Sequence, residues 1–352
     1  MTEPDGDILA IGPAWVGDMV MSQVLYRQLA ASRPGSAIDV LAPAWSAPLL
    51  GRMPEVRTLI PMPLAHGEWN FGTRRRLGLS LRERGYGQAI VLPNSWKSAL
   101  VPWYAGIARR TGWRGEMRYG LLNDLRRLDE QALPMMAQRF LALGLPADAA
   151  LPPLLPEPRL TVDAAEARGA ALRFELDTGQ PLLALCPGAA SGTAKRWPAA
   201  YFSEVARCYL DRGWRVVLLG SSSDAADCAG IARGCADAGR CLNLAGRTTL
   251  DEAVLLLSRS SAVVSNDSGL MHVAAALGRT VLGIYGPTSP EFTPPLSARA
   301  VVVSPDIACA PCHQSVCPLG HHRCMRDTPA EAVIARLDAA LAGAPPFAQT
   351  LA

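Results

Sequence analysis

The sequence predicts an α/β fold of two successive domains, each with a doubly wound parallel sheet. Three observations favour this fold. Short apolar or β-branched runs alternate with longer amphipathic runs. The alternation stops in a proline-rich stretch at 145–160 and then starts again. The length of 352 residues is sufficient for about two domains, each with its own core.

In the N-terminal half, apolar runs predict four strands, with helical patterns between them. The strands are expected at 8–13, 37–43, 56–63 and 88–94. An amphipathic run predicts a helix over 17–32, and residues 114–132 are polar, rich in arginine and less regular. The proline-rich stretch is the best linker candidate, so we expect a first domain over 1–150.

The same alternation of apolar and amphipathic runs predicts a second domain over 160–328. Its strands are expected within 181–190, 215–224, 241–246, 261–269 and 280–287. A final helix is expected at 329–343, in a C-terminal helix and tail over 329–352. Ligands of such sheets bind at the carboxyl ends of the strands, which predicts a site in the cleft between the domains.

Composition and charge limit the possible classes of protein. The net charge of +3 argues against a binder of polyanions, and no nucleic-acid motif is present. The first residues lack the apolar segment of a signal peptide, and no run of 18 apolar residues predicts a membrane span. We therefore expect a cytoplasmic protein whose nine cysteines are mostly reduced.

Positive charge is distributed unevenly. Of the 34 basic residues, only Lys97 and Lys195 are lysines, which marks them as places where a compact ammonium is needed. Residues 52–127 contain fourteen Lys and Arg against five Asp and Glu, a local balance of 14 − 5 = +9. Four tryptophans are interleaved there, namely Trp69, Trp96, Trp103 and Trp113. This segment is either a surface for phosphates and lipid or an ordinary solvated face.

The first loop of chemical interest is GPAWVGD at 12–18. It leaves the first expected strand and enters a helix, with Asp18 in the first helical turn. Asp18 is a candidate general base for an incoming hydroxyl. The alternative is that its charge only stabilises the helix N-terminus.

The second loop, PGAASGTAKRWP at 187–198, has the composition of a diphosphate cradle. Backbone N–H groups and hydroxyls are offered by Gly188, Ser191, Gly192 and Thr193. Lys195 adds a compact positive charge, and Arg196 could add a second, which a leaving diphosphate requires. The alternative for Lys195 is a solvated loop lysine.

The third loop, SNDSGLMH at 265–272, follows a strand and opens a helix. Its candidate ligands for a sugar and a phosphate are Asp267, Ser268, Gly269 and His272. Helix capping is a competing role for the first two. A fourth loop at 285–295 brings Thr288, Ser289 and Pro290 to another strand end, and its alternative is an ordinary proline-rich turn.

A cysteine cluster follows the fourth loop. It contains Cys309, Cys312, Cys317 and Cys324. The CxxC pair with two further cysteines is a candidate structural zinc site, although the later spacings are short and irregular. The alternatives are a packed loop of reduced thiols and a disulfide formed on isolation.

Taken together, these motifs resemble one family, the ADP-heptose–lipopolysaccharide heptosyltransferases, and most of all their heptosyltransferase II branch. The motifs that carry the resemblance are GPAWVGDMVMSQ, PGAASGTAKRWP, NDSGLMHVAAALG, YGPTSPEFTPPL and CAPCHQSVCPLGHHRC. The resemblance spans residues 8 to about 325, which is nearly the whole chain. The resemblance implies a GT-B-type architecture of two Rossmann-like domains, with the acceptor in the first and the sugar nucleotide in the second.

The implied reaction moves L-glycero-D-manno-heptose from ADP-heptose to the first heptose of a Kdo-lipid A inner core, with inversion. Asp18 inherits the role of base, while Thr193 and Lys195 inherit contact with the diphosphate. Asp267 inherits contact with the heptose, within a donor site that includes Ser268, Gly269 and His272. No cofactor is implied, and the glycolipid acceptor implies peripheral contact with the cytoplasmic face of the inner membrane.

On the acceptor side we assign Gly17, Asn94 and Lys97, which follow the first and fourth expected strands. Two alternatives to the implied function stay open at this point. One is a sibling transferase that adds a different core heptose. The other is a non-catalytic module of the same fold that binds a sugar nucleotide.

Overall fold

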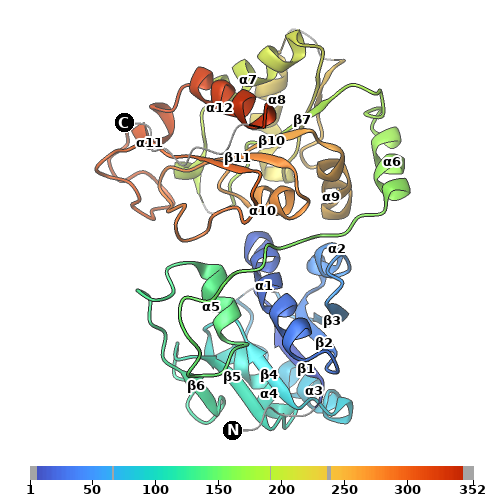
Figure 1. The fold of residues 1–352 in the computed structure, drawn as a ribbon, viewed down its shortest axis with the longest axis vertical. Helices are drawn as coiled ribbons and strands as arrows, with labels where there is room; N and C mark the ends of the chain where they lie inside the picture. Colours follow the sequence, from blue (N-terminus) through green and yellow to red (C-terminus); the bar gives the residue numbers. More distant parts are fainter. Residues whose placement is uncertain (1–5, 66, 191, 236–238, 344–352) are drawn as a thin grey trace. The chain divides into compact units, whose positions relative to one another are not determined.

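The computed structural model describes residues 6–65, 67–190, 192–235 and 239–343. The chain forms two compact units, which meet in sequence between Pro158 and Arg159. In Figure 1 the N-terminal unit is coloured from blue to green and the C-terminal unit from green to red. The boundary lies in the proline-rich stretch.

A six-stranded parallel sheet forms the centre of the N-terminal unit, in the order β3-β2-β1-β4-β5-β6. The strands are β1 (Ile8–Ile11), β2 (Ile38–Pro43), β3 (Val56–Met62), β4 (Gln88–Val91), β5 (Arg109–Trp113) and β6 (Asp124–Arg126). The helices are α1 (Val16–Ser32), α2 (Ala47–Leu50), α3 (Phe71–Ser80), α4 (Leu100–Tyr104) and α5 (Met136–Ala142). Helix α1 packs against α5, and α3 packs against α4.

The C-terminal unit repeats this plan with the sheet order β12-β11-β10-β7-β8-β9. Its strands are β7 (Leu182–Cys186), β8 (Arg215–Leu218), β9 (Cys241–Asn243), β10 (Ala262–Asn266), β11 (Thr280–Ile284) and β12 (Ala300–Val303). Its helices are α6 (Ala164–Arg173), α7 (Ala199–Asp211), α8 (Ala225–Arg233), α9 (Leu250–Arg259), α10 (Gly269–Ala276), α11 (Arg323–Arg326) and α12 (Ala330–Leu341).

Both sheets have the same topology. Counted from the first strand of each unit, the order is 3-2-1-4-5-6, which is that of a Rossmann fold. In each unit the first and fourth strands are adjacent, and the chain leaves them in opposite directions. These positions are the topological switch points at which ligands of such sheets bind. The predicted fold class, α/β with two doubly wound domains, is confirmed.

The strands at the centre of each sheet are apolar because both of their faces are covered. All residues of β1 and of β7 are buried. The N-terminal core includes Leu9, Val91 and Leu122, and the C-terminal core includes Leu185, Phe202 and Val264. These cores hold the strand ends, and therefore the loops that follow them, in fixed positions.

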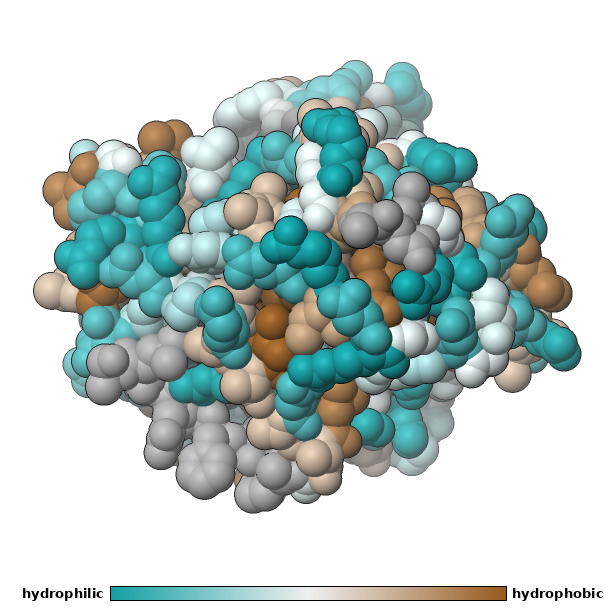
Figure 2. Space-filling view, turned by 90° about the horizontal axis from the view of Figure 1, so that it is seen from above, coloured by the Kyte–Doolittle hydropathy of each residue, from teal (hydrophilic) through white to brown (hydrophobic). Residues whose placement is uncertain are grey.

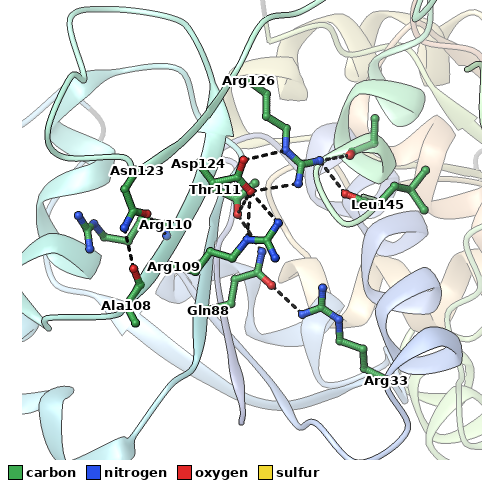
Figure 3. Close-up of polar contacts among 11 residues, drawn as sticks. Arg33, Gln88, Ala108, Arg109, Arg110, Thr111, Asn123, Asp124, Arg126 and Leu145 are labelled. Atoms are coloured by element: carbon green, nitrogen blue, oxygen red, sulfur yellow. Dashed lines mark hydrogen bonds and ion pairs between the residues drawn. The ribbon is translucent and has the colours of Figure 1, made fainter. Parts of the chain in front are cut away.

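The arginine-rich segment expected to be irregular contains β6 at the edge of the sheet. Asp124, its first residue, accepts hydrogen bonds from Arg109 (3.0 and 3.1 Å), Thr111 (2.9 Å) and Arg126 (3.1 Å), as Figure 3 shows. Although burial opposes ionisation, the bonds from these side chains lower the pKa of Asp124. The sequence did not predict this strand, because strands were expected in apolar runs and polar side chains hold this one in place.

No helix in the described part of the chain is long and apolar enough to cross a membrane. Figure 2 shows hydrophilic and apolar residues intermingled on the face that it draws.

Candidate active site

Asp18 lies in the first turn of α1, directly after β1 and at the switch point of the N-terminal sheet. Its side chain is half-buried, and Gly17 before it is buried. The preceding loop is tightly packed, because a Cβ on Gly12 would lie 3.1 Å from the Met19 side chain. The positive end of the helix dipole favours a carboxylate at this position.

The loop after β4 carries the two other acceptor-side candidates. Asn94 is exposed, and Lys97 is half-buried in a 3₁₀ turn at Trp96–Ala99. Because β4 is hydrogen-bonded to β1, this loop and the Asp18 loop follow adjacent strand ends. The structure therefore brings Asn94, Lys97 and Asp18 to the same edge of one sheet.

Arg118 holds this loop, and sequence reasoning missed it. Its guanidinium donates to the carbonyl of Pro93 (2.6 Å), to Oδ1 of Asn94 (3.3 Å) and to the carbonyl of Trp113. The residue is buried, and burial lowers the pKa of Arg118 to about 10. The arginine-rich segment was recognised, but nothing in its pattern distinguished this buried arginine from exposed ones.

In the C-terminal unit, the loop after β7 forms the candidate diphosphate site. Thr193 is exposed, and Lys195 is half-buried in the 3₁₀ turn that contains both residues. Gly192 has a φ of +126°, and a Cβ there would lie 2.1 Å from the carbonyl oxygen of Ser315, so only glycine fits. Ser191, also assigned to this site, lies outside the described residues.

Two members of this loop make contacts that the sequence did not predict. A Cβ on Gly188 would lie 2.5 Å from Oδ2 of Asp224, so this glycine permits close packing of a carboxylate. Arg196, the expected second charge, pairs with Asp227 at 2.7 Å and lies 3.8 Å from Asp224. Its charge is thus directed to the segment after β8, which leaves Lys195 as the cation of the loop.

Lys195 and Asp267 form the centre of the site. Lys195 Nζ lies 2.6 Å from Asp267 Oδ2, which also accepts a 2.7 Å hydrogen bond from the hydroxyl of Thr288. The carboxylate is 7% exposed and the lysine side chain 18% exposed. Loops after β7, β10 and β11 therefore converge on one buried oxygen, as their shared strand edge predicts.

Asn266, the last residue of β10, joins the same loops and was not predicted. Its side-chain amide donates to the carbonyl of Pro187 (2.6 Å), and its Oδ1 accepts from the N–H of Trp197 (3.2 Å). The side chain is fully buried. It thus ties both ends of the Lys195 loop to β10. An Asn at the end of an apolar strand was the only signal in the sequence.

The start of α10 completes the candidate donor site. Ser268 occupies the N-cap position without a side-chain cap hydrogen bond and lies 3.1 Å from Ser265 through its hydroxyl. Ser268 therefore occupies the expected cap position, but its side chain does not cap the helix, which begins at Gly269. Burial lowers the pKa of His272 to about 4, assisted by Lys195 and opposed by Asp267, so its ring is neutral.

The cysteine cluster does not form the zinc site considered from the sequence. Burial and the neighbouring thiols of Cys309, Cys312 and Cys317 raise the pKa of Cys324 to about 11, so the four share one neighbourhood. Among the described residues, however, no group of three or more His, Cys, Asp or Glu side chains is arranged to hold a metal ion. The four thiols lie near one another but are not arranged as metal ligands, so the structure does not support a zinc site.

The cysteine-rich segment instead supports the donor loops. The N–H of Ala194 donates to the carbonyl of Ser315 (3.1 Å), and the N–H of His313 donates to the carbonyl of Pro287 (2.7 Å). The segment thus contacts the loops after β7 and β11 through backbone groups.

Each unit gathers polar side chains at the switch point of its sheet, and comparison with known proteins decides the family. Residues 74–322 match the model of Glycosyltransferase family 9 (heptosyltransferase). The chain belongs to glycosyltransferase family 9. The matched range extends from α3 to the cysteine-rich segment, which includes every loop of the candidate donor site.

Relatives of this family 9 chain are similar over nearly its whole length. It is 50% identical to lipopolysaccharide heptosyltransferase 2 of Escherichia coli K12 over 341 residues, with 95% of this chain and 98% of the relative covered. It is 53% identical to lipopolysaccharide heptosyltransferase 2 of Salmonella typhimurium, with coverages of 84% and 87%. The family 9 chain is therefore a heptosyltransferase of lipopolysaccharide core biosynthesis, and the non-catalytic alternative is wrong.

Solved structures agree with this result. The structure of E. coli ADP-heptose lps heptosyltransferase II matches with a TM-score of 0.87 and 48% identity, covering 96% of this chain and 99% of that one. E. coli heptosyltransferase WaaC with ADP-2-deoxy-2-fluoro heptose matches with a TM-score of 0.70 at 20% identity, covering 95% and 99%, and shares the fold. The family 9 chain has the GT-B-type fold that its motifs implied.

Proposed function

We propose that this enzyme transfers L-glycero-D-manno-heptose from ADP-heptose to the first heptose of the Kdo-lipid A inner core, with inversion at the anomeric carbon. Relatives named heptosyltransferase 2 are about half identical to this chain, whereas heptosyltransferase 1 of Pseudomonas aeruginosa is 27% identical. This difference favours addition of the second heptose over addition of another core heptose.

The observation that carries the proposal is the convergence of Lys195, Asp267 and Thr288 at the switch point of the C-terminal sheet. Lys195 is the one lysine in residues 159–352. A departing diphosphate requires a fixed positive charge, which Lys195 supplies, together with donors such as Thr193 and the N–H groups at the start of α10. Asp267 would then accept a hydrogen bond from a heptose hydroxyl.

On the acceptor side, Asp18 takes the proton of the attacking hydroxyl. One bond forms between the acceptor oxygen and the anomeric carbon as the bond from that carbon to the diphosphate oxygen breaks. ADP leaves with the bonding electrons, and a single displacement inverts the configuration. His272 is neutral at neutral pH, so it acts in this site as a hydrogen-bonding group without charge.

Because Lys195 and backbone N–H groups carry the charge stabilisation, we propose that transfer needs no added cofactor. The lipid of the acceptor places the enzyme in peripheral contact with the cytoplasmic face of the inner membrane. Activity that persists in EDTA would support transfer without a metal cofactor. A loss of activity in EDTA that is restored by a divalent cation would contradict it.

The decisive test replaces Asp18 by Asn or Ala and measures transfer from ADP-heptose to defined core acceptors by mass spectrometry. We expect the rate to fall by about 100-fold or more, with binding of ADP-heptose retained in calorimetry. Glu331→Gln is the matched control, because Glu331 is an exposed carboxylate in the first turn of α12. Transfer by Asp18→Ala at the wild-type rate would disprove the base assignment.

The acceptor is tested with core glycolipids that contain no heptose or one heptose. The proposal predicts product only from the acceptor that already contains one heptose. Product from the heptose-free acceptor would instead identify the enzyme as the sibling that adds the first heptose.

A further inference from the structure

Aromatic side chains follow the carboxyl ends of four neighbouring strands in the N-terminal unit. The strands are β3, β2, β1 and β4, and the side chains after them are, in the same order, Trp69, Trp45, Trp15 and Trp96. Trp69 is 55% exposed, and Phe71 beside it is 47% exposed. Such large apolar side chains are costly to leave in water, so their accumulation at one edge requires an explanation.

Three of these rings form a cluster, which we call the aromatic platform: Trp69, Phe71 and Trp96. The ring centroid of Trp96 lies 5.7 Å from that of Trp69 and 5.5 Å from that of Phe71. Two strands, β2 and β1, separate β3 from β4 in the sheet. The segment after β3 therefore extends along the sheet edge until its aromatic residues meet the loop after β4.

A buried arginine fixes the platform. The guanidinium of Arg74 donates to the carbonyls of Glu68 (2.8 Å), Trp69 (3.1 Å) and Lys97 (3.5 Å). Arg74 is 5% exposed, and burial lowers its pKa. The exposed rings thus belong to a segment that is tied to the loop after β4, and they are not the tip of an unattached loop.

Positive charge surrounds the platform. Lys97 Nζ lies 5.6 Å from the centroid of the Trp69 ring, and Arg75 and Arg76 are exposed on α3. Residues 67–76 contain three arginines and one acid, Glu68, whose carboxylate accepts the N–H of Ala65. Exposed indole and phenyl rings next to cations are suited to the headgroup region of an anionic bilayer.

We propose that the aromatic platform seats the enzyme on the anionic phospholipid surface in which its acceptor is embedded. Trp69 and Phe71 enter the boundary between headgroups and acyl chains, while Arg75 and Arg76 meet lipid phosphates. This inference rests on the proposed function for the glycolipid nature of the acceptor. The binding itself requires only lipid, so it can be measured without donor or acceptor.

The test is flotation of the full chain with vesicles of equal parts phosphatidylcholine and phosphatidylglycerol that contain no acceptor. We expect wild type to float and the double variant Trp69→Ser/Phe71→Ser to partition at least about tenfold more weakly. The charge variant Arg75→Glu/Arg76→Glu should lose binding to these vesicles, and added salt should weaken wild-type binding. Leu172→Ser is the matched control, because Leu172 is a 57% exposed apolar residue on α6 of the other unit.

A second arm separates lipid contact from sugar contact. The double variant should transfer heptose to a water-soluble, deacylated acceptor at the wild-type rate, and about tenfold more slowly to the same core presented in vesicles. Equal losses with both acceptors would show that the platform binds the saccharide and would overturn the proposal. Failure of wild type to float would also overturn it. Flotation without transfer to any core acceptor would instead reject the proposed function.

Discussion

Replacing Lys195 by Met tests whether this lysine stabilises the leaving group or only balances Asp267. The substitution keeps the length of the side chain and removes the charge 2.6 Å from Asp267 Oδ2. Loss of one partner from a buried ion pair costs about 3–5 kcal/mol. Here the cost should be about 2 kcal/mol, because Lys195 is 18% exposed and the carboxylate keeps its hydrogen bond from Thr288.

The effect on the reaction should be larger and should not follow stability. Removing a fixed donor from a developing negative charge lowers kcat by about 100-fold to 1,000-fold. Adding Asp267→Asn to Lys195→Met removes the unpaired carboxylate, so the double variant should regain about 1 kcal/mol of stability. Its kcat should stay low, because neither substitution restores a cation. Urea denaturation of the C-terminal unit measures the change in stability. Steady-state kinetics with ADP-heptose measure the change in kcat.

Recovery of transfer in the double variant would refute this reasoning, because Lys195 would then act only by neutralising Asp267. Lys195→Arg supplies a further comparison. It keeps the charge but replaces a compact ammonium with a larger planar group, and we expect an intermediate kcat.

Three other variants test single contacts, two in the candidate donor site and one at the edge of the N-terminal sheet. Since burial lowers the pKa of His272 to about 4, the unfolded chain binds a proton that the folded chain does not between about pH 6.5 and pH 4. The free energy of unfolding should therefore fall by up to about 3 kcal/mol as the pH decreases through this window, and urea titrations of His272→Gln should lack that fall. Gly192→Ala places a Cβ against Ser315 and should raise the KM for ADP-heptose about tenfold, whereas Gly179→Ala, also at positive φ but in open space, should not. Asp124→Asn should lower the thermal stability of the N-terminal unit by about 2 kcal/mol while kcat per folded molecule is kept, and equal stability would contradict the role given to its arginine contacts.

The order of apolar runs and of the loops between them was sufficient to determine the fold class. Buried parallel strands require continuous apolar segments, and each loop after a strand carries its own local signature. For this reason the α/β class and the family could be predicted from residues such as Asp18, Lys195 and Asp267. The roles of these residues stay predictions until the variants are measured.

Only the tertiary structure decided which side chains meet. Lys195 and Asp267 are 72 residues apart, and their contact depends on adjacent placement of β7 and β10. Asn266, Arg74 and Arg118 act through buried hydrogen bonds to backbone groups. Such bonds leave no pattern in the sequence, in which a buried Asn or Arg cannot be distinguished from an exposed one. The absence of a ligand arrangement among the described cysteines was likewise a matter of geometry, since spacing along the chain does not fix where thiols point.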